Sequence, residues 1–149
     1  MTKKSNFSLV LETPAASPEE ARRHFLAKLS VETDVADVAL DLRRGNDSFI
    51  LVDVRSQEAY ADCHIPGAIN LPARQINSDT TAALPSDKLI VTYCWGPACN
   101  SSTKAAARFA SLGFPVKELI GGIEYWRREG GAVEGRLCEK APLHWNMND

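Results

Sequence analysis

The sequence lacks an apolar run long enough to cross a membrane, because a helical span needs about 20 apolar residues and the longest runs fall far short. The beginning of the chain contains Lys3, Lys4 and a few apolar side chains. Glu12 and Pro14 interrupt it before a signal-peptide core or a cleavage site. We therefore expect a cytoplasmic protein.

An excess of one charge is also missing. The 149 residues include 17 lysines and arginines against 19 acidic residues, which are mixed along the chain and give a formal net charge of −2. A nucleic-acid or membrane-surface protein usually carries a clustered basic patch. The composition thus predicts neither kind of partner, and it gives no indication of an oligomeric state.

Histidines and cysteines are few, and their spacing does not suit a metal site. The three histidines are scattered singly, and no Cys-x-x-Cys pair occurs. The chain has four cysteines: Cys63, Cys94, Cys99 and Cys138. A chain of this length can bury a core without a disulfide framework, so two structural disulfides are not expected. We expect no metal and no other cofactor.

The sequence alternates predicted strands and helices, with no repeat and no linker. The apolar run 49–54 predicts a strand buried on both faces, and residues 88–93 and 115–120 predict two more. Helix starts and apolar periodicity predict helices from Ser17, from Thr33 to Gly45, and over residues 56–62, 102–112 and 123–129. This pattern indicates an α/β fold with a mainly parallel sheet, which binds ligands beyond the carboxyl ends of its strands.

Cys94 is the most informative residue, because it follows a predicted strand and precedes a turn and a helix. Backbone N–H groups and the positive end of a helix dipole converge at such a position. They lower the pKa of a thiol and favour the reactive thiolate. Asp53 ends a neighbouring predicted strand. The alternative interpretation of Cys94 is a small buried core residue.

The chain resembles a single rhodanese-like domain. The resemblance is carried by Leu51-Val52-Asp53-Val54-Arg55, Glu58, Tyr60, His64-Ile65-Pro66-Gly67-Ala68-Ile69-Asn70-Leu71-Pro72, Ile90-Val91-Thr92-Tyr93-Cys94, the helix of residues 104–108, Leu112-Gly113-Phe114, Leu119-Ile120-Gly121-Gly122-Ile123 and Trp126. It implies a three-layer fold with a mainly parallel five-stranded sheet and helices on both faces. The domain would span residues 33–135, after an extension (1–32) whose helix packs on the body and before a tail (136–149).

The resemblance implies that Cys94 is the nucleophile of a sulfurtransferase. Such a cysteine takes a sulfane sulfur from a small-molecule or protein donor, becomes a persulfide, and passes the sulfur to a thiophilic acceptor such as a thiol. Backbone groups of the following loop would hold the persulfide anion. The loop consists of Trp95, Gly96, Pro97, Ala98, Cys99 and Asn100.

The loop departs from the family pattern because residues 95–102 include no charged side chain. Many active members have a basic residue there, often arginine, which can bind a doubly charged oxyanion. This departure disfavours thiosulfate as donor, and a phosphatase activity even more. Arg74, in the polar segment that begins after Leu71-Pro72-Ala73, could point toward the pocket and supply the missing positive charge. Asp53 could orient the loop, although a structural role, as partner of Arg55 or of a neighbouring turn, is the favoured interpretation.

Cys99 is the second departure, and it leaves two interpretations open. It could be a resolving cysteine that attacks a persulfide or sulfenate on Cys94 and leaves a disulfide. This requires Cα atoms within about 7 Å, which a curled loop allows. Otherwise Cys99 packs into the base of the loop. A thiol–disulfide redox or sensing protein and a non-catalytic binding module are therefore alternatives to the sulfurtransferase, and the binding module predicts a Cys94 pKa near about 8.5.

Overall fold

The computed structural model describes residues 3–148, so residues 1, 2 and 149 of the predicted extension and tail lie outside the described residues. The chain divides into two compact units, Met1–Ser30 and Val31–Asp149. Helix α1 (Pro18–Val31) begins in the first unit, where the Ser17 hydroxyl accepts a hydrogen bond from the Glu20 N–H at 3.2 Å. This confirms the predicted helix start.

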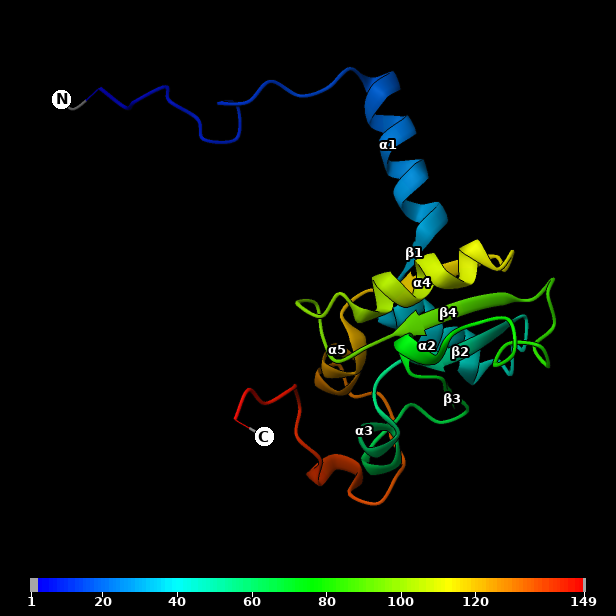
Figure 1. Ribbon diagram of the computed structural model, residues 1–149. Coiled ribbons are helices and arrows are strands. Elements are labelled where there is room, and N and C mark those ends of the chain that lie inside the picture. Colours follow the sequence, from blue (N-terminus) through cyan, green and yellow to red (C-terminus); the bar gives the residue numbers. More distant parts are fainter. Residues whose placement is uncertain (1–2, 149) are drawn as a thin grey trace. The chain divides into compact units, whose positions relative to one another are not determined.

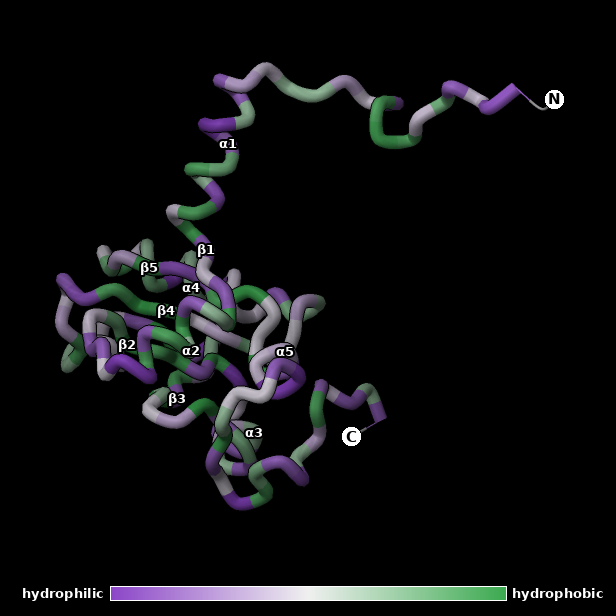
Figure 2. The backbone as a smooth tube through the Cα atoms, turned by 180° about the vertical axis from the view of Figure 1, so that it is seen from behind, coloured by the Kyte–Doolittle hydropathy of each residue, from purple (hydrophilic) through white to green (hydrophobic). Residues whose placement is uncertain are grey.

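The second unit is built on a five-stranded sheet whose neighbouring strands are all parallel, as predicted. Its order is β1-β5-β4-β2-β3. The strands are β1 (Glu32–Thr33), β2 (Phe49–Asp53), β3 (Ile69–Asn70), β4 (Leu89–Tyr93) and β5 (Val116–Leu119). Figure 2 shows hydrophobic residues concentrated along β2 and β4, the inner strands that must be buried on both faces.

Helices cover both faces of the sheet and give the predicted three layers (Figure 1). They are α2 (Val35–Arg43), α3 (Gln57–Asp62), α4 (Ser101–Ser111) and α5 (Gly122–Arg128), with short 3₁₀ helices η1 (Ala73–Gln75) and η2 (Cys138–Lys140). Side chains alternate along β4: Val91 and Tyr93 pack with α2 and α5, whereas Ile90 packs with α4. Cys94 continues this alternation and packs on the α4 side.

The start of α2 differs from the prediction. Thr33 does not open a helix but belongs to β1, which pairs with β5. The helix is capped one residue later, by the Asp34 carboxylate, which accepts a hydrogen bond from the Asp37 N–H at 2.9 Å. The sequence correctly predicts a helix start here. Its position shifts by one residue because Glu32 and Thr33 pair with β5.

The segment after α5 packs back on the rest of the second unit. The Arg127 guanidinium donates to the carbonyl groups of Glu139, Ala141 and Pro142, and Ala141 is buried in the core. These contacts bring the described part of the C-terminal segment toward the carboxyl ends of the strands.

Candidate active site

Cys94 stands directly after β4 and is held there by both neighbouring elements. Strand β2 is in register with β4 up to the Asp53–Tyr93 pair, and the Val54 N–H donates to the Tyr93 carbonyl at 3.1 Å. On the other side the Cys94 carbonyl accepts a hydrogen bond from the Ile123 N–H at 3.0 Å. The Cys94 side chain is 2% exposed.

The first turn of α5 holds the start of the loop through backbone hydrogen bonds. The Trp95 carbonyl accepts from the Glu124 N–H at 2.8 Å. Because a trans peptide directs its C=O and N–H in opposite directions, the N–H groups of Trp95 and Gly96 point away from α5. A Cβ on Gly122 would lie 2.6 Å from the Cys94 carbonyl oxygen and 2.8 Å from the Gly96 nitrogen. Glycine is therefore required at position 122 for this approach.

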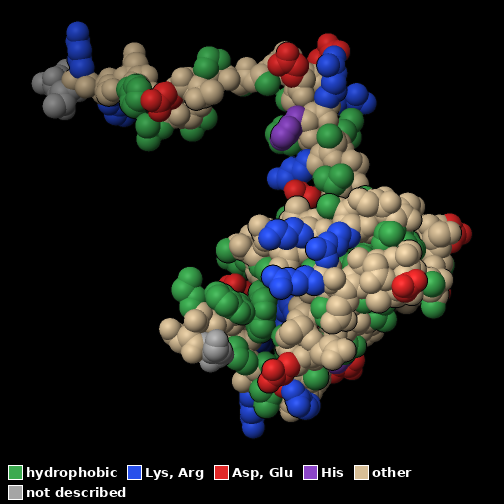
Figure 3. Space-filling view, in the orientation of Figure 1, with side chains coloured by type: hydrophobic (Ala, Val, Ile, Leu, Met, Phe, Trp, Pro, Cys, Tyr) green, Lys and Arg blue, Asp and Glu red, His purple; other side chains and the backbone are tan. Residues whose placement is uncertain are grey.

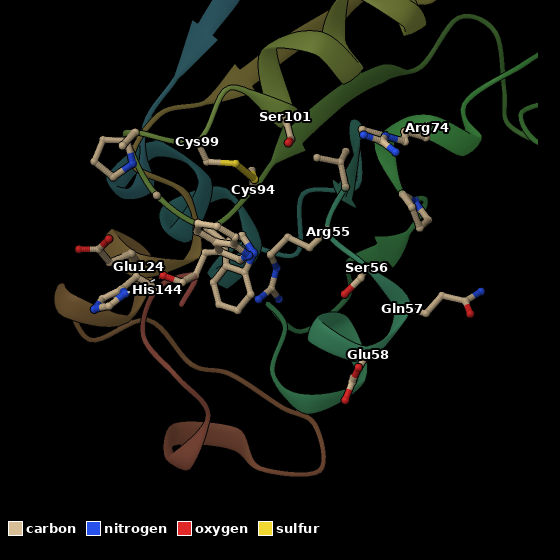
Figure 4. Close-up of a pocket in the computed structure, with 18 of the residues that line it drawn as sticks. Arg55, Ser56, Gln57, Glu58, Arg74, Cys94, Cys99, Ser101, Glu124 and His144 are labelled. Atoms are coloured by element: carbon tan, nitrogen blue, oxygen red, sulfur yellow. Dashed lines mark hydrogen bonds between the residues drawn. A yellow bond between two sulfur atoms is a disulfide. The ribbon is translucent and has the colours of Figure 1, made fainter. Parts of the chain in front are cut away.

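The loop curls so that its two cysteines meet. The Cys99 N–H donates to the Gly96 carbonyl at 3.0 Å, and Cys94 and Cys99 form a disulfide with a Cα–Cα distance of 6.4 Å (Figure 4). Asn100 occupies the N-cap position of α4 without a side-chain capping bond. The interpretation of Cys99 as a partner within reach of Cys94 thus agrees with the loop geometry.

A cavity of about 1070 Å³ opens beside the loop. Its walls come from the loop, the β2–α3 connection, η1, α5 and the C-terminal segment (Figure 4). The lining residues are Val54, Arg55, Ser56, Gln57, Glu58, Pro72, Ala73, Arg74, Gln75, Cys94, Trp95, Gly96, Pro97, Ala98, Cys99, Ser101, Glu124, His144 and Trp145. Of the predicted site residues, the structure places Asn100 at the start of α4, Asp53 in the interior and not on the cavity wall, and the others on that wall.

Asp53 is wholly buried and acts on the cavity through Arg55. Its carboxylate accepts from Nη2 of Arg55 at 2.8 Å and from the Arg55 N–H at 2.9 Å, so of the two structural partners that the sequence left open Asp53 pairs with Arg55. Nη2 also donates to the Cys63 carbonyl. The guanidinium carbon lies 4.5 Å from the centroid of the Trp95 ring, a cation–π contact. Asp53 therefore fixes Arg55, and Arg55 supports Trp95.

Charges around the cavity are mixed rather than basic. Arg55 is neutralised by Asp53, and Arg74 is exposed on η1, which α4 holds through a hydrogen bond from Arg108 to the Ala73 carbonyl. Figure 3 shows Lys and Arg side chains gathered on the face near α4. The wall also includes Glu124, whose Oε1 would lie 2.7 Å from a Cβ on Gly96. Sequence reasoning missed this acid beneath the loop.

His64 lies in a structural network and does not line the cavity. Its Nδ1 is 2.7 Å from the Tyr60 carbonyl and its Nε2 is 3.0 Å from Glu134 Oε1, while its ring stacks on Tyr60. This agrees with the prediction that the His64 side chain forms a hydrogen bond with the backbone.

Two buried groups have raised pKa values. Burial raises the pKa of the Cys63 thiol, and burial together with the negative charge of Asp53 holds the pKa of Tyr93 well above its usual value.

Within residues 3–148, no group of three His, Cys, Asp or Glu side chains is arranged to hold a metal ion. In the same part of the chain, no helix has the length and apolar character required to span a membrane.

Comparison with known proteins places these features in a family. A family model for the rhodanese-like domain matches residues 35–129. The chain is 38% identical over 114 residues to a helix-turn-helix-type transcriptional regulator from Mycobacterium tuberculosis, covering 76% of this chain and 48% of the regulator. It is 38% identical over 79 residues to the thiosulfate sulfurtransferase GlpE of Pseudomonas syringae, covering 52% of this chain and 72% of GlpE.

Solved structures agree with this assignment. The BH2092 protein from Bacillus halodurans superimposes with a TM-score of 0.87 at 62% identity, covering 88% of this chain and 96% of that protein. The rhodanese-like domain of an Anabaena protein superimposes with a TM-score of 0.65 at 30% identity, covering 71% and 80%. The chain spans about half the length of the Mycobacterium regulator, so the role of that whole protein does not carry over to it.

Proposed function

The chain belongs to the rhodanese-like domain family, and from this premise we propose that it is a sulfurtransferase that carries sulfane sulfur as a persulfide on Cys94. Similarity to thiosulfate sulfurtransferases supports a sulfurtransferase-family role. The observation that carries the finer proposal is the position of Cys94, which follows β4 at the edge of the cavity. Parallel α/β sheets bind ligands at this edge.

Transfer takes two steps. The Cys94 thiolate attacks the outer sulfur of the donor, the donor's sulfur–sulfur bond breaks, and the rest of the donor leaves with the electron pair. An acceptor thiolate then attacks the outer sulfur of the Cys94 persulfide, and Cys94 returns as a thiolate. The N–H groups of Trp95 and Gly96 and the start of α4 supply partial positive charge for the persulfide anion.

The cavity supports an organic persulfide as donor rather than thiosulfate. A small dianion needs concentrated positive charge, yet Arg55 is already paired with Asp53, and Glu124 at the loop is itself paired with Arg128. The cavity volume of about 1070 Å³ exceeds the need of a small anion, and Trp95 and Trp145 offer apolar surface for a larger molecule. The acceptor is a thiol, small or on a protein, and the proposed setting is the cytoplasm. The proposal includes no cofactor.

Mass spectrometry of the reduced full chain after incubation with glutathione persulfide tests the proposal. The test is made in the Cys99→Ser background, which lacks the second loop thiol. We expect one added sulfur on Cys94 in Cys99→Ser and none at position 94 when Cys94→Ser is added. Cys63→Ser in the same background is the matched control, because Cys63 is a free cysteine with the same 2% exposure. Equal sulfur gain with and without Cys94→Ser would refute the mechanism.

The disulfide favours a second candidate, a thiol–disulfide redox or sensing protein that uses Cys94 and Cys99. In this function an oxidant, and not a sulfur donor, drives formation of the bond. Non-reducing peptide mapping after mild peroxide treatment without any donor distinguishes the two. Both thiols remaining free while bulk glutathione is oxidised would exclude the redox function.

A further inference from the structure

We propose that Cys99 makes this domain a sulfide-releasing enzyme: it attacks the persulfide on Cys94, expels the outer sulfur as hydrogen sulfide, and leaves the Cys94–Cys99 disulfide. The inference rests on the proposed function, because it needs a persulfide on Cys94. In this reaction the thiol of Cys99 takes the place of the external acceptor thiol in the second transfer step.

The geometry that carries the inference is the curled loop. The two cysteines are five positions apart and their Cα atoms are 6.4 Å apart, so their sulfur atoms can bond while Cys94 stays at the end of β4. Backbone bonds from α5 to Cys94 and Trp95, and from Cys99 to Gly96, hold both ends of the loop. Both cysteines line the cavity in which a donor would leave its sulfur.

The step balances without an added oxidant. The Cys99 thiolate attacks the Sγ atom of Cys94, the bond between that Sγ and the outer sulfur breaks, and the outer sulfur leaves as HS⁻ with the bonding electron pair. HS⁻ then takes a proton from water. The sulfane sulfur of the donor is the oxidant, because it is reduced to sulfide while the two thiols become a disulfide.

Proximity favours Cys99 over an external thiol. A thiol on the same short loop has an effective concentration of at least about 1 mM, and a fixed loop geometry raises it further. The uncharged loop places no carboxylate between the two sulfurs, and the amides that hold the persulfide anion also stabilise the departing HS⁻.

The other two cysteines do not fit this role. Both are free thiols, but Cys63 is 2% exposed and burial raises the pKa of its thiol. The Cys138 thiol bonds the Gly135 carbonyl at 3.1 Å, and Cys138 does not line the cavity. Resetting the cycle therefore requires an external dithiol, which reaches the disulfide through the cavity, forms a mixed disulfide and leaves oxidised.

A single-turnover experiment tests the inference. Reduced full-length chain receives one equivalent of glutathione persulfide without oxygen or added thiol, and sulfide is measured above the background of Cys94→Ser. We expect one sulfide per wild-type chain and a Cys94–Cys99 disulfide in the peptide map. Cys99→Ser and Cys99→Ala should both keep the added sulfur on Cys94 and release sulfide at least about ten-fold more slowly. Cys63→Ser should behave as the wild type.

Two kinds of failure are distinguishable. If Cys99→Ser carries sulfur on Cys94 but the wild type keeps it equally long, the proposed function stands and the release step is wrong. A persulfide moved to Cys99 without sulfide, or a trisulfide between the two cysteines, also overturns the release step. If neither Cys99 variant gains sulfur on Cys94, the proposed function itself fails.

Discussion

Cys94 and Cys63 are equally buried, at 2% exposure each, but they lie in very different surroundings. Cys94 follows a central parallel strand and borders the cavity. Cys63 caps the end of α3, its N–H donates to the Ala59 carbonyl, and burial raises the pKa of its thiol. Exposure therefore does not separate a candidate nucleophile from an inert core residue, whereas position at the carboxyl edge of the sheet does.

The surroundings of Cys63 and of Cys94 are nevertheless connected by one ion pair, Asp53–Arg55. Arg55 donates to the Cys63 carbonyl and stacks on Trp95, beside Cys94, while Asp53 neutralises it. A change at this pair should thus disturb both cysteines, and changes elsewhere should affect only one of them.

The largest effect is expected for Asp53→Asn, which leaves the buried Arg55 charge without its counter-ion. We expect the free energy of unfolding to fall by about 3–5 kcal/mol in urea denaturation. The control is Arg136→Ala, which removes the exposed ion pair to Asp62 and should cost less than about 1 kcal/mol. An equal fall in the free energy of unfolding for both variants would contradict the structural importance of the Asp53–Arg55 pair.

At neutral pH we expect iodoacetamide to alkylate Cys94 about 100-fold faster than Cys63, because burial raises the pKa of the Cys63 thiol and the proposed function places the Cys94 thiolate beside backbone amides of its loop. In reduced protein, the iodoacetamide pH–rate profile of Cys94 should have its midpoint below about 8.5, and that of Cys63 above it. Peptide mapping assigns each rate. A Cys94 midpoint at the ordinary value would favour the binding-module hypothesis.

Gly122→Ala should disturb the surroundings of Cys94 and leave those of Cys63 unchanged. Its Cβ would meet the Cys94 carbonyl at 2.6 Å, and its φ of +63° adds strain of about 1–2 kcal/mol. Gly130→Ala is the matched control, because its φ is +87° but nothing lies within 4 Å of its Cβ. We expect about ten-fold slower Cys94 alkylation in Gly122→Ala alone, and unchanged Cys63 alkylation in both variants.

High pH should weaken the fold modestly through the region of Cys63 and Tyr93. Both groups have raised pKa values in the folded state, so the unfolded chain loses these protons first, near 9.0 and 10.0. Stability from these groups is full below pH 9 and declines as pH rises through the folded pKa values. Urea denaturation from pH 8 to 11 checks this, and Cys63→Ala should reduce the decline near pH 9.

The smallest effect is expected at the rim of the cavity. Trp145 is 60% exposed, so Trp145→Ala should raise KM for an organic persulfide about three-fold without changing kcat. Met147, 83% exposed and outside the cavity wall, is the control position. An unchanged KM would show that the C-terminal segment does not contact the donor.

The sequence could predict the elements whose side chains follow a clear period. The apolar runs of β2 and β4 and the one-sided helix α4 were recognisable, and so was Cys94 between them. Strand β1 was missed because its two residues are polar and owe their conformation to pairing with β5.

Site residues were predictable where they are neighbours in sequence and unpredictable where folding brings them together. The loop around Cys94 is recognisable from sequence, whereas for Arg55 the sequence predicts only a structural pairing and does not show that it also lines the cavity. Glu124 reaches the loop through the turn at Gly122, and Trp145 arrives from a segment that Arg127 anchors. No local pattern signals either approach, although a paired glycine before a short helix could have indicated close packing beneath a loop.

The register of β2 and β4 has a consequence for how this site can change during evolution. Because side chains alternate along a strand, inserting or deleting one residue within β4 would turn Cys94 toward the opposite face of the sheet. Residues inserted between Ala98 and Asn100 would leave that register and the α5 bonds untouched. The length of the loop can therefore vary, and with it the choice of sulfur compound, while the reacting atom keeps its place.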